Sequence, residues 1–380
     1  MQRYYLPTEI ITGSGSLSQL GRIAARYGQR VMVVTYAGFA RFSDVLSRAM
    51  QVLRAENLQV TLYDQVTGEA ELRVVEAGIA LARQEGCQAF IGIGGGSSID
   101  TAKAIAGLVS LPGSVWEYHG GRALEGPGLP FIAVPTTAGT GAEVTKNAVL
   151  IDPRTDVKKS IRDDAWFARV ALVDPELTLS MPPQVTASTG ADALCQGIES
   201  FTSIAATPLT DALAMQAIAL TGRNLLRAYQ AGDDLAAREA MSMGSLMAGM
   251  AMVNARLGGV HGMAHPLGSH FHIPHGVICG LLLPYTMEYN LPYTMAKYAQ
   301  VARLLGEPVE GLAVEVAARK AVERVSELMA QLGIPAHLSQ FGVTEGSFEQ
   351  IAKESQSESL KHNPRPLGLE DVRQIMKAAL

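Results

Sequence analysis

The sequence predicts an α/β dinucleotide-binding domain of the Rossmann-like type, followed by an all-α domain. In the first half of the chain, short runs of β-branched and apolar residues alternate with segments of helical periodicity. This alternation is typical of a parallel sheet covered by helices on both faces. Beyond residue 180 such runs become scarce, and Ala, Leu and Met recur at helical spacing, as in residues 209–226 and 235–252.

The predicted elements follow one another regularly. Strands are predicted at residues 4–12 (short strands around Pro7), 31–35, 60–63, 89–93, 131–135 and 171–175. Helices of the first domain are predicted at residues 17–24, 43–56 and 70–86. After the last strand, the apolar residues change from β-branched runs to Ala, Leu and Met at helical spacing, which indicates a domain boundary near residue 180. We therefore predict an α/β domain at residues 1–180 and a helical domain at 181–380.

Composition narrows the class of protein. A chain of 380 residues, with 48% hydrophobic and 18% charged residues, can bury a large core and is typical of a globular protein. The formal net charge of −5 and the lack of a dense Lys/Arg run argue against nucleic acid as a partner. No apolar run reaches the ~18 residues of a membrane span, so no membrane is expected, and the N-terminus lacks a signal pattern.

The three cysteines, Cys87, Cys195 and Cys279, are widely spaced and form no CxxC pair. This pattern favours buried, reduced thiols over a disulfide framework or a zinc-thiolate site. We therefore expect a cytoplasmic protein. Soluble enzymes of this size are commonly symmetric, so a homodimer or a larger homo-oligomer is also expected.

A glycine-rich turn follows the strand predicted at 89–93, where residues 91–103 read IGIGGGSSIDTAK. Glycine lets the backbone approach a ligand closely, and the amides at a helix start attract an anion such as a pyrophosphate. The turn differs from the GxGxxG fingerprint, because Ser97 stands where the last glycine would be. An ordinary tight turn is the alternative interpretation. A second turn of small residues, PTTAGTGAEVT at 135–145, offers hydroxyls and amides that suit a ribose or a nicotinamide amide.

Five of the eight histidines lie between residues 257 and 276. If this segment is helical up to Pro266, with a loop beyond it, His261 and His265 share one helix face. Asp192 lies in an apolar, helix-forming run at 190–200, where a carboxylate needs a cation. Histidines and a carboxylate from distant segments are typical of a metal site. Histidines satisfied within a core or loop are the alternative.

These motifs, in this order, resemble the iron-dependent (group III) alcohol dehydrogenase family over nearly the whole chain. The residues that carry the resemblance are Gly94-Gly95-Gly96-Ser97 with Asp100 and Lys103, Thr136 to Gly141, Asp174-Pro175, Gly190 to Leu194, His261 to Gly268, Pro274-His275-Gly276 and Asn363-Pro364-Arg365. The resemblance implies a nucleotide domain, a helical domain and a cleft between them that holds NAD or NADP and one divalent metal.

The family's functional residues carry over position by position. The resemblance implies that a pyrophosphate is held by Gly94, Gly95, Gly96 and Ser97, and that other cofactor contacts are made by Asp100, Thr136, Thr137 and Lys158. It also implies that the metal is held by Asp192, His261 and His275, with Gln196 at the fourth ligand position. His265 matches the additional histidine near the substrate, where it would relay a proton as the catalytic residue.

Two departures leave the choice of metal and nucleotide open. Iron members usually have a histidine where this chain has Gln196, and an amide oxygen is a poorer donor to iron or zinc than an imidazole. Glycerol dehydrogenases look similar in binding zinc through one aspartate and two histidines, so both iron and zinc stay open. Tyr36 stands where many NAD-preferring relatives have an aspartate that repels a 2′-phosphate. NADP is therefore not electrostatically excluded.

The implied activity is hydride transfer between nicotinamide C4 and an alcohol or carbonyl substrate at the metal, catalysed by an NAD(P)-linked alcohol dehydrogenase or aldehyde reductase. A metal-independent reductase of the maleylacetate reductase type is the main alternative, since one metal-site histidine is missing. A lyase similar to the dehydroquinate synthases and a non-catalytic nucleotide-binding protein are further alternatives. The identity of the substrate does not follow from the sequence.

Overall fold

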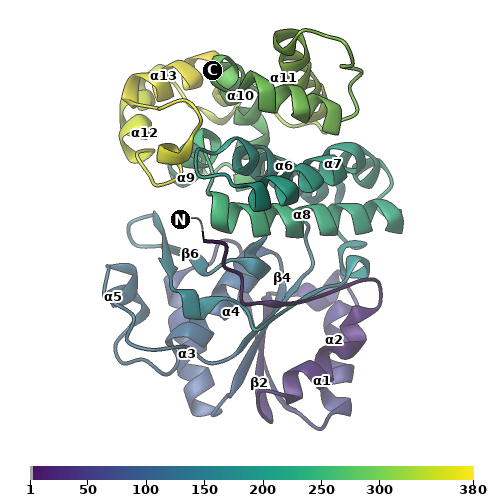
Figure 1. Cartoon of the computed structure of the whole chain (residues 1–380). Helices are drawn as coiled ribbons and strands as arrows, with labels where there is room; N and C mark the ends of the chain where they lie inside the picture. Colours follow the sequence, from purple (N-terminus) through teal and green to yellow (C-terminus); the bar gives the residue numbers. More distant parts are fainter. Residues whose placement is uncertain (1–2) are drawn as a thin grey trace. The chain divides into compact units, whose positions relative to one another are not determined.

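The computed structural model describes residues 3–380, so the first two residues of the predicted N-terminal domain lie outside the described residues (Figure 1). The chain forms two compact units. The α/β unit comprises residues 6–137 and 142–181. The helical unit comprises residues 182–380 together with residues 138–141 and residues 3–5. The predicted fold class, a parallel α/β domain and an all-helical domain, is confirmed.

The α/β unit is built on a six-stranded parallel sheet in the order β1-β8-β5-β4-β2-β3. Its strands are β1 (Glu9–Thr12), β2 (Arg30–Tyr36), β3 (Gln59–Val66), β4 (Ala89–Gly94), β5 (Phe131–Pro135) and β8 (Val170–Val173). The inner strands are buried on both faces, which explains their nearly continuous apolar sequences. Strand order reverses between β2 and β4, and ligands of open α/β sheets bind at the carboxyl ends of such strands.

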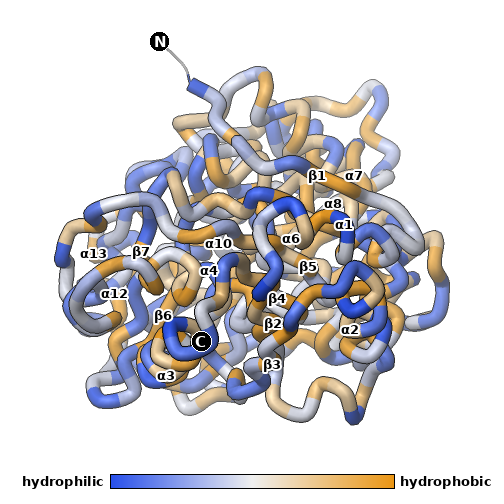
Figure 2. Tube along the Cα trace, turned by 90° about the horizontal axis from the view of Figure 1, so that it is seen from below, coloured by the Kyte–Doolittle hydropathy of each residue, from blue (hydrophilic) through white to orange (hydrophobic). Residues whose placement is uncertain are grey.

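Helices cover both faces of this sheet. They are α1 (Leu20–Ala25), α2 (Val45–Ala55), α3 (Leu72–Gln84), α4 (Gly96–Leu108) and the short α5 (Val115–His119). Val31 and Val33 of β2 pack with α1 and α2, whereas Met32 and Val34 pack with α3 and α4. Figure 2 shows the hydrophobic colouring concentrated along the central strands. An antiparallel hairpin that the sequence analysis did not predict, β6 (Asn147–Asp152) with β7 (Val157–Arg162), lies outside the main sheet.

The helical unit consists of α6 (Pro183–Thr202), α7 (Pro208–Gln230), α8 (Leu235–Ala255), α9 (Gly259–Phe271), α10 (His275–Leu304), α11 (Val314–Gln331), α12 (Phe348–Glu354) and α13 (Leu369–Ala378). Local signals fix several of the helix starts. Thr207 accepts a hydrogen bond from the Thr210 amide before α7, and Asp234 accepts one from the Ala237 amide before α8. One continuous core of small and aliphatic residues joins the helices. None of the helices in residues 3–380 is long and apolar enough to cross a membrane.

The prediction that the helix stops at Pro266 and a loop follows is wrong. Helix α9 continues through this proline to Phe271. A proline inside a helix removes one backbone hydrogen bond and bends the helix. Here Pro266 and Leu267 are buried, so their packing offsets that loss. The helix ends at Phe271, and the left-handed backbone of the next residue, His272 (φ 52°), turns the chain toward α10.

A buried ion pair within α4 is hydrogen-bonded to the segment that leads into β6 and to β6 itself. The Lys103 ammonium lies 3.3 Å from the Asp100 carboxylate, and the second oxygen of Asp100 accepts a hydrogen bond from the Val149 amide. Lys103 also donates to the carbonyls of Ala142 and Asn147 and to the hydroxyl of Thr145, at 2.8–2.9 Å. Asp100, which the resemblance assigns to cofactor binding, is thus engaged by Lys103 and by the Val149 amide.

Replacing Lys103 by Met is expected to destabilise the α/β unit by about 3–5 kcal/mol, because a buried Asp100 charge and two carbonyls lose their donor. Urea unfolding followed by circular dichroism measures this loss. Lys159→Met is the matched control, since Lys159 lies exposed on β7 and its replacement removes the same charge. Equal stability of the two variants would contradict the assigned role of the pair.

Candidate metal centre and nucleotide turn

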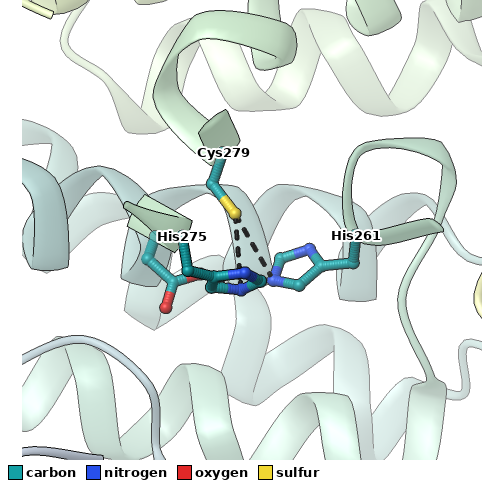
Figure 3. A group of neighbouring side chains, drawn as sticks. His261, His275 and Cys279 are labelled. Carbon is teal, nitrogen blue, oxygen red and sulfur yellow. Dashed lines mark hydrogen bonds and ion pairs between the residues drawn. The ribbon is translucent and has the colours of Figure 1, made fainter. Parts of the chain in front are cut away.

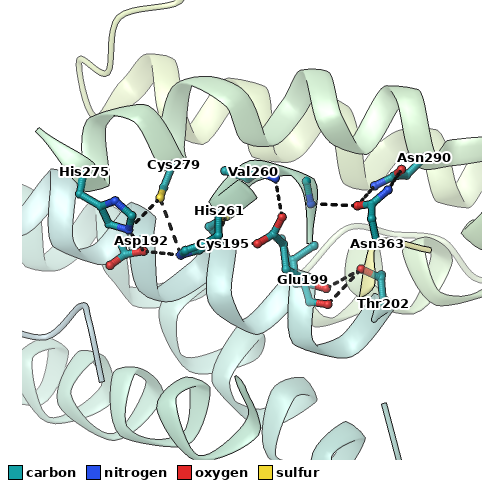
Figure 4. A network of polar contacts seen from close by, with 12 residues as sticks. Asp192, Cys195, Glu199, Thr202, Val260, His261, His275, Cys279, Asn290 and Asn363 are labelled. Atoms are coloured by element: carbon teal, nitrogen blue, oxygen red, sulfur yellow. Dashed lines mark hydrogen bonds and ion pairs between the residues drawn. The ribbon is translucent and has the colours of Figure 1, made fainter. Parts of the chain in front are cut away.

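Three helices of the helical unit bring one carboxylate and two imidazoles together (Figure 4). Asp192 lies in the middle of α6, His261 in the first turn of α9, and His275 at the start of α10. One oxygen of Asp192 (Oδ1) lies 3.2 Å from Nε2 of His261 and 3.9 Å from Nε2 of His275. The structure therefore places the three predicted metal ligands in one group.

The other side of His261 contacts a carboxylate that the sequence analysis did not assign. Glu199 follows Asp192 by two turns on α6, and its Oε2 lies 2.6 Å from Nδ1 of His261. Its Oε1 accepts a hydrogen bond of 2.7 Å from the Val260 amide. Burial opposes protonation of His261, but negative charge on Cys279 and Glu199 and the contact with Asp192 raise its pKa well above the ordinary value. This surrounding charge favours a cation at the imidazole.

Asparagine side chains secure the start of α9. Asn363, near the end of the chain, accepts a hydrogen bond from the Gly259 amide at 3.1 Å. It also exchanges two hydrogen bonds, of 2.7 and 3.0 Å, with Asn290 on α10. A Cβ on Gly258 would lie 2.9 Å from Asn363 Oδ1 and 3.0 Å from Glu199 Oε1, so a larger residue there would displace one of these two side chains. These contacts link the two helices that carry His261 and His275.

Cys279 is a fourth potential ligand that the sequence analysis treated only as a buried thiol. It is fully buried, and its Sγ lies 3.7 Å from Nε2 of His275 and 3.9 Å from Nε2 of His261. Figure 3 shows the sulfur directed at both rings. The available signal was its position four residues after His275, which places both side chains on one face of α10. As predicted, all three cysteines are buried and free.

Gln196 lies one turn after Asp192 on α6 and is buried. Its Oε1 atom has no hydrogen-bond partner among the described residues. The donor atoms of Asp192, His261, His275 and Cys279 all lie within 4.8 Å of one another. One carboxylate oxygen, two imidazole nitrogens and a sulfur at such spacing fit a divalent transition metal.

His265 lies one turn beyond His261 on α9 and is half-buried. The centroid of its ring lies 5.7 Å from that of His275, and the two rings are tilted by 32°. The His275 side chain is 27% exposed, whereas Asp192 is 2% exposed. His265 and His275 thus form the more accessible side of the cluster.

The glycine-rich turn starts at the carboxyl end of β4 in the α/β unit. Gly94 has φ 146°, a conformation that favours glycine, and a Cβ there would lie 2.7 Å from Ser98 Oγ. α4 begins at Gly96 without a side-chain cap, so its first amides remain available to an anion. Ser97 lies in this first turn. The geometry fits a pyrophosphate.

The second turn lies beside the first. The amide of Thr136 donates a hydrogen bond of 2.9 Å to the Gly94 carbonyl, and Thr137 faces Gly95, where a Cβ would lie 3.4 Å from its methyl group. Lys158, by contrast, lies on β7 and its ammonium forms an ion pair of 2.9 Å with Glu69. Tyr36 ends β2 and donates a hydrogen bond of 3.3 Å to the Thr67 carbonyl.

Comparison with known proteins shows which family has this sequence and fold. Residues 7–175 match the model of the iron-containing alcohol dehydrogenases, and residues 186–380 match that of the C-terminal region of the Fe-containing alcohol dehydrogenase family. The NAD-dependent methanol dehydrogenase of Bacillus methanolicus is 34% identical over 100% of both chains. The 1,3-propanediol dehydrogenase of Klebsiella pneumoniae is 37% identical over 99% of this chain and 98% of its own.

A solved structure shares the whole fold. The crystal structure of a 1,3-propanediol oxidoreductase superposes with a TM-score of 0.96 at 37% identity, and the match covers 100% of both chains. Both units thus have counterparts in one protein, in the same order along the chain. The family resemblance noted from the sequence motifs is confirmed. The chain belongs to the iron-containing alcohol dehydrogenase family.

Proposed function

We propose that the chain is an NAD-linked dehydrogenase that interconverts small alcohols and aldehydes at a divalent metal held by Asp192, His261 and His275. The observation that carries this proposal is the convergence of the three side chains, with Asp192 Oδ1 at 3.2 and 3.9 Å from the two Nε2 atoms. Family membership supplies the reaction class, and the relative from Bacillus methanolicus is NAD-dependent. The proposed substrates are short alcohols, because relatives are named for methanol and 1,3-propanediol.

The proposed division of labour follows from the positions of the side chains. When bound, the nicotinamide carries the hydride and the metal polarises the substrate oxygen. Asp192 and His261, both almost fully buried, hold the cation against displacement by water. His265, on the accessible side of the cluster, takes the alcohol proton or returns it. The turn at Gly94 to Ser97 and the hydroxyls of Thr136 and Thr137 hold the nucleotide.

Removal of the metal tests this proposal. Protein purified without chelator is expected to contain about one metal per chain and to change absorbance at 340 nm with NAD and methanol or 1,3-propanediol. Dialysis against a chelator should abolish turnover, and added Zn²⁺ or Fe²⁺ should restore it. NADP is assayed in parallel, because the uncharged Tyr36 ends β2 where the family resemblance implies an aspartate in many NAD-preferring relatives. Full turnover by metal-free protein would contradict the proposal and favour a reductase of the metal-independent type.

A further inference from the structure

The donor atoms of Asp192, His261, His275 and Cys279 are spaced nearly as closely as the ligands of one metal ion. In a tetrahedral zinc site, ligand distances of about 2.0–2.2 Å for nitrogen and oxygen and about 2.3 Å for sulfur separate neighbouring donors by roughly 3.3–3.7 Å. The oxygen-to-nitrogen separations here are 3.2 and 3.9 Å. The sulfur of Cys279 lies 3.7 and 3.9 Å from the same two nitrogens. Cys279 therefore occupies a corner that is compatible with binding the same ion.

A second group of donors, on the Nδ1 side of His261, is a less suitable site. It consists of Cys195, Glu199 and His261, and all three are fully enclosed. Glu199 Oε2 lies only 2.6 Å from Nδ1, which is a hydrogen-bond distance and shorter than the separation of two ligands of one ion. The Asp192 side, in contrast, reaches solvent through His275. A catalytic ion needs such access, so it belongs on the Nε2 side.

Because Gln196 occupies the position of the family's fourth metal ligand, a sulfur ligand would compensate for a weak donor there. A neutral amide oxygen binds zinc or iron weakly, whereas a thiolate contributes a negative, polarisable donor. Cys279 is completely buried; Figure 3 shows its sulfur beside the two imidazoles, and Figure 4 adds Asp192 to this group. A cysteine binds a metal as the deprotonated thiolate. The chain thus offers a carboxylate, two imidazoles and one thiolate.

We infer that Cys279 is the fourth protein ligand of the metal and that its sulfur selects zinc over ferrous iron. This inference rests on the proposed function, which places a metal at Asp192, His261 and His275. Thiolate ligands favour zinc, and zinc already binds more tightly than ferrous iron to most donor sets. Substrate would then enter as a fifth ligand on the exposed side of His275; some catalytic zinc sites become five-coordinate in the transition state.

Cobalt substitution tests the ligand directly and without an activity assay. The full-length protein is stripped of metal and loaded with Co²⁺, and its near-ultraviolet absorption is recorded. A thiolate bound to Co²⁺ gives a charge-transfer band, which serine cannot give. We expect the band in the wild type and its loss in Cys279→Ser. Cys195→Ser is the matched control, because Cys195 is equally buried but contacts Nδ1 of His261, at 3.9 Å.

Competition between metals tests the selectivity. Under anaerobic conditions, the preference of the wild type for Zn²⁺ over Fe²⁺ should exceed that of Cys279→Ser at least about tenfold, with Cys195→Ser like the wild type. Should the serine variant fold poorly, X-ray absorption of the zinc-loaded wild type replaces it. One sulfur neighbour at about 2.3 Å is expected there.

The outcomes separate this inference from the proposed function. Wild-type protein that binds Co²⁺ without the charge-transfer band, or zinc-loaded protein without a sulfur neighbour, would overturn the assignment of Cys279 alone. Wild-type protein that binds none of these ions would overturn both. A band that persists in Cys279→Ser but disappears in Cys195→Ser would assign the metal to the other side of His261.

Discussion

Asp192→Asn is expected to reduce kcat/KM by at least about 10³-fold and to leave the purified protein without stoichiometric metal. The substitution keeps the size of the side chain but removes the only carboxylate on the Nε2 side of His261 and His275 among the described residues. Because Asp192 is 2% exposed, water cannot replace the lost charge. Metal analysis and steady-state assays at 340 nm measure the two effects.

The control for this variant is Asp211→Asn in the same helical unit. Asp211 pairs with Lys297 at 3.1 Å, and its side chain is 28% exposed, so its neutralisation should leave the metal content unchanged. Binding of NAD, followed by calorimetry, should persist in Asp192→Asn, because the glycine-rich turn belongs to the other unit. Wild-type turnover by Asp192→Asn would remove the metal from the proposed mechanism.

The sheet was predictable from the sequence because its inner strands are buried on both faces. The runs at β2, β4 and β5 are almost continuously apolar, and only a parallel strand covered by helices requires this. The hairpin β6–β7 lacks such a run. Burial alternates along β6, and in β7 two lysines, Lys158 and Lys159, follow the first residue, so the apolar pattern is short and weak. The predicted end of α9 at Pro266 is wrong because tertiary packing, which the local sequence does not show, decides whether a helix tolerates proline.

The metal cluster was predictable only in part. Asp192, His261 and His275 were singled out because their residue types and surroundings are unusual in an apolar segment or resemble family motifs. Cys279 and Glu199 were not assigned a role. Their contacts depend on how α6, α9 and α10 are rotated about their axes, and helical periodicity in one segment does not determine this rotation. Only the spacing of four residues between His275 and Cys279 pointed to a shared face.

Glu199→Gln is expected to weaken metal binding by about 10–100-fold, although Glu199 is not among the proposed ligands. Its two oxygens accept hydrogen bonds from different donors, the Val260 amide at 2.7 Å and Nδ1 of His261 at 2.6 Å. With the proton on Nδ1, Nε2 is free to bind the metal. Glutamine has only one oxygen, so its NH₂ group must face either the Val260 amide or the imidazole.

Both orientations of the introduced glutamine side chain impair the site. An NH₂ group toward His261 favours the tautomer with its proton on Nε2, which cannot bind the metal. An NH₂ group toward Val260 leaves a buried donor unpaired, which destabilises the start of α9 by about 1–3 kcal/mol. Chelator competition and calorimetry measure the metal affinity, and urea unfolding of the metal-free protein measures the stability.

Glu354→Gln provides a matched control, because Glu354 contacts His270 at 2.7 Å in a similar Glu–His pair whose side chains are 44% and 36% exposed. Its metal affinity should equal that of the wild type. The two measurements on Glu199→Gln distinguish positioning from simple capping. If stability falls while metal affinity stays unchanged, Glu199 serves only as a cap for the Val260 amide. If the free energy of metal binding falls by more than the free energy of unfolding, the carboxylate orients His261 for the metal. Unchanged metal affinity in Glu354→Gln then shows that this role requires a buried pair.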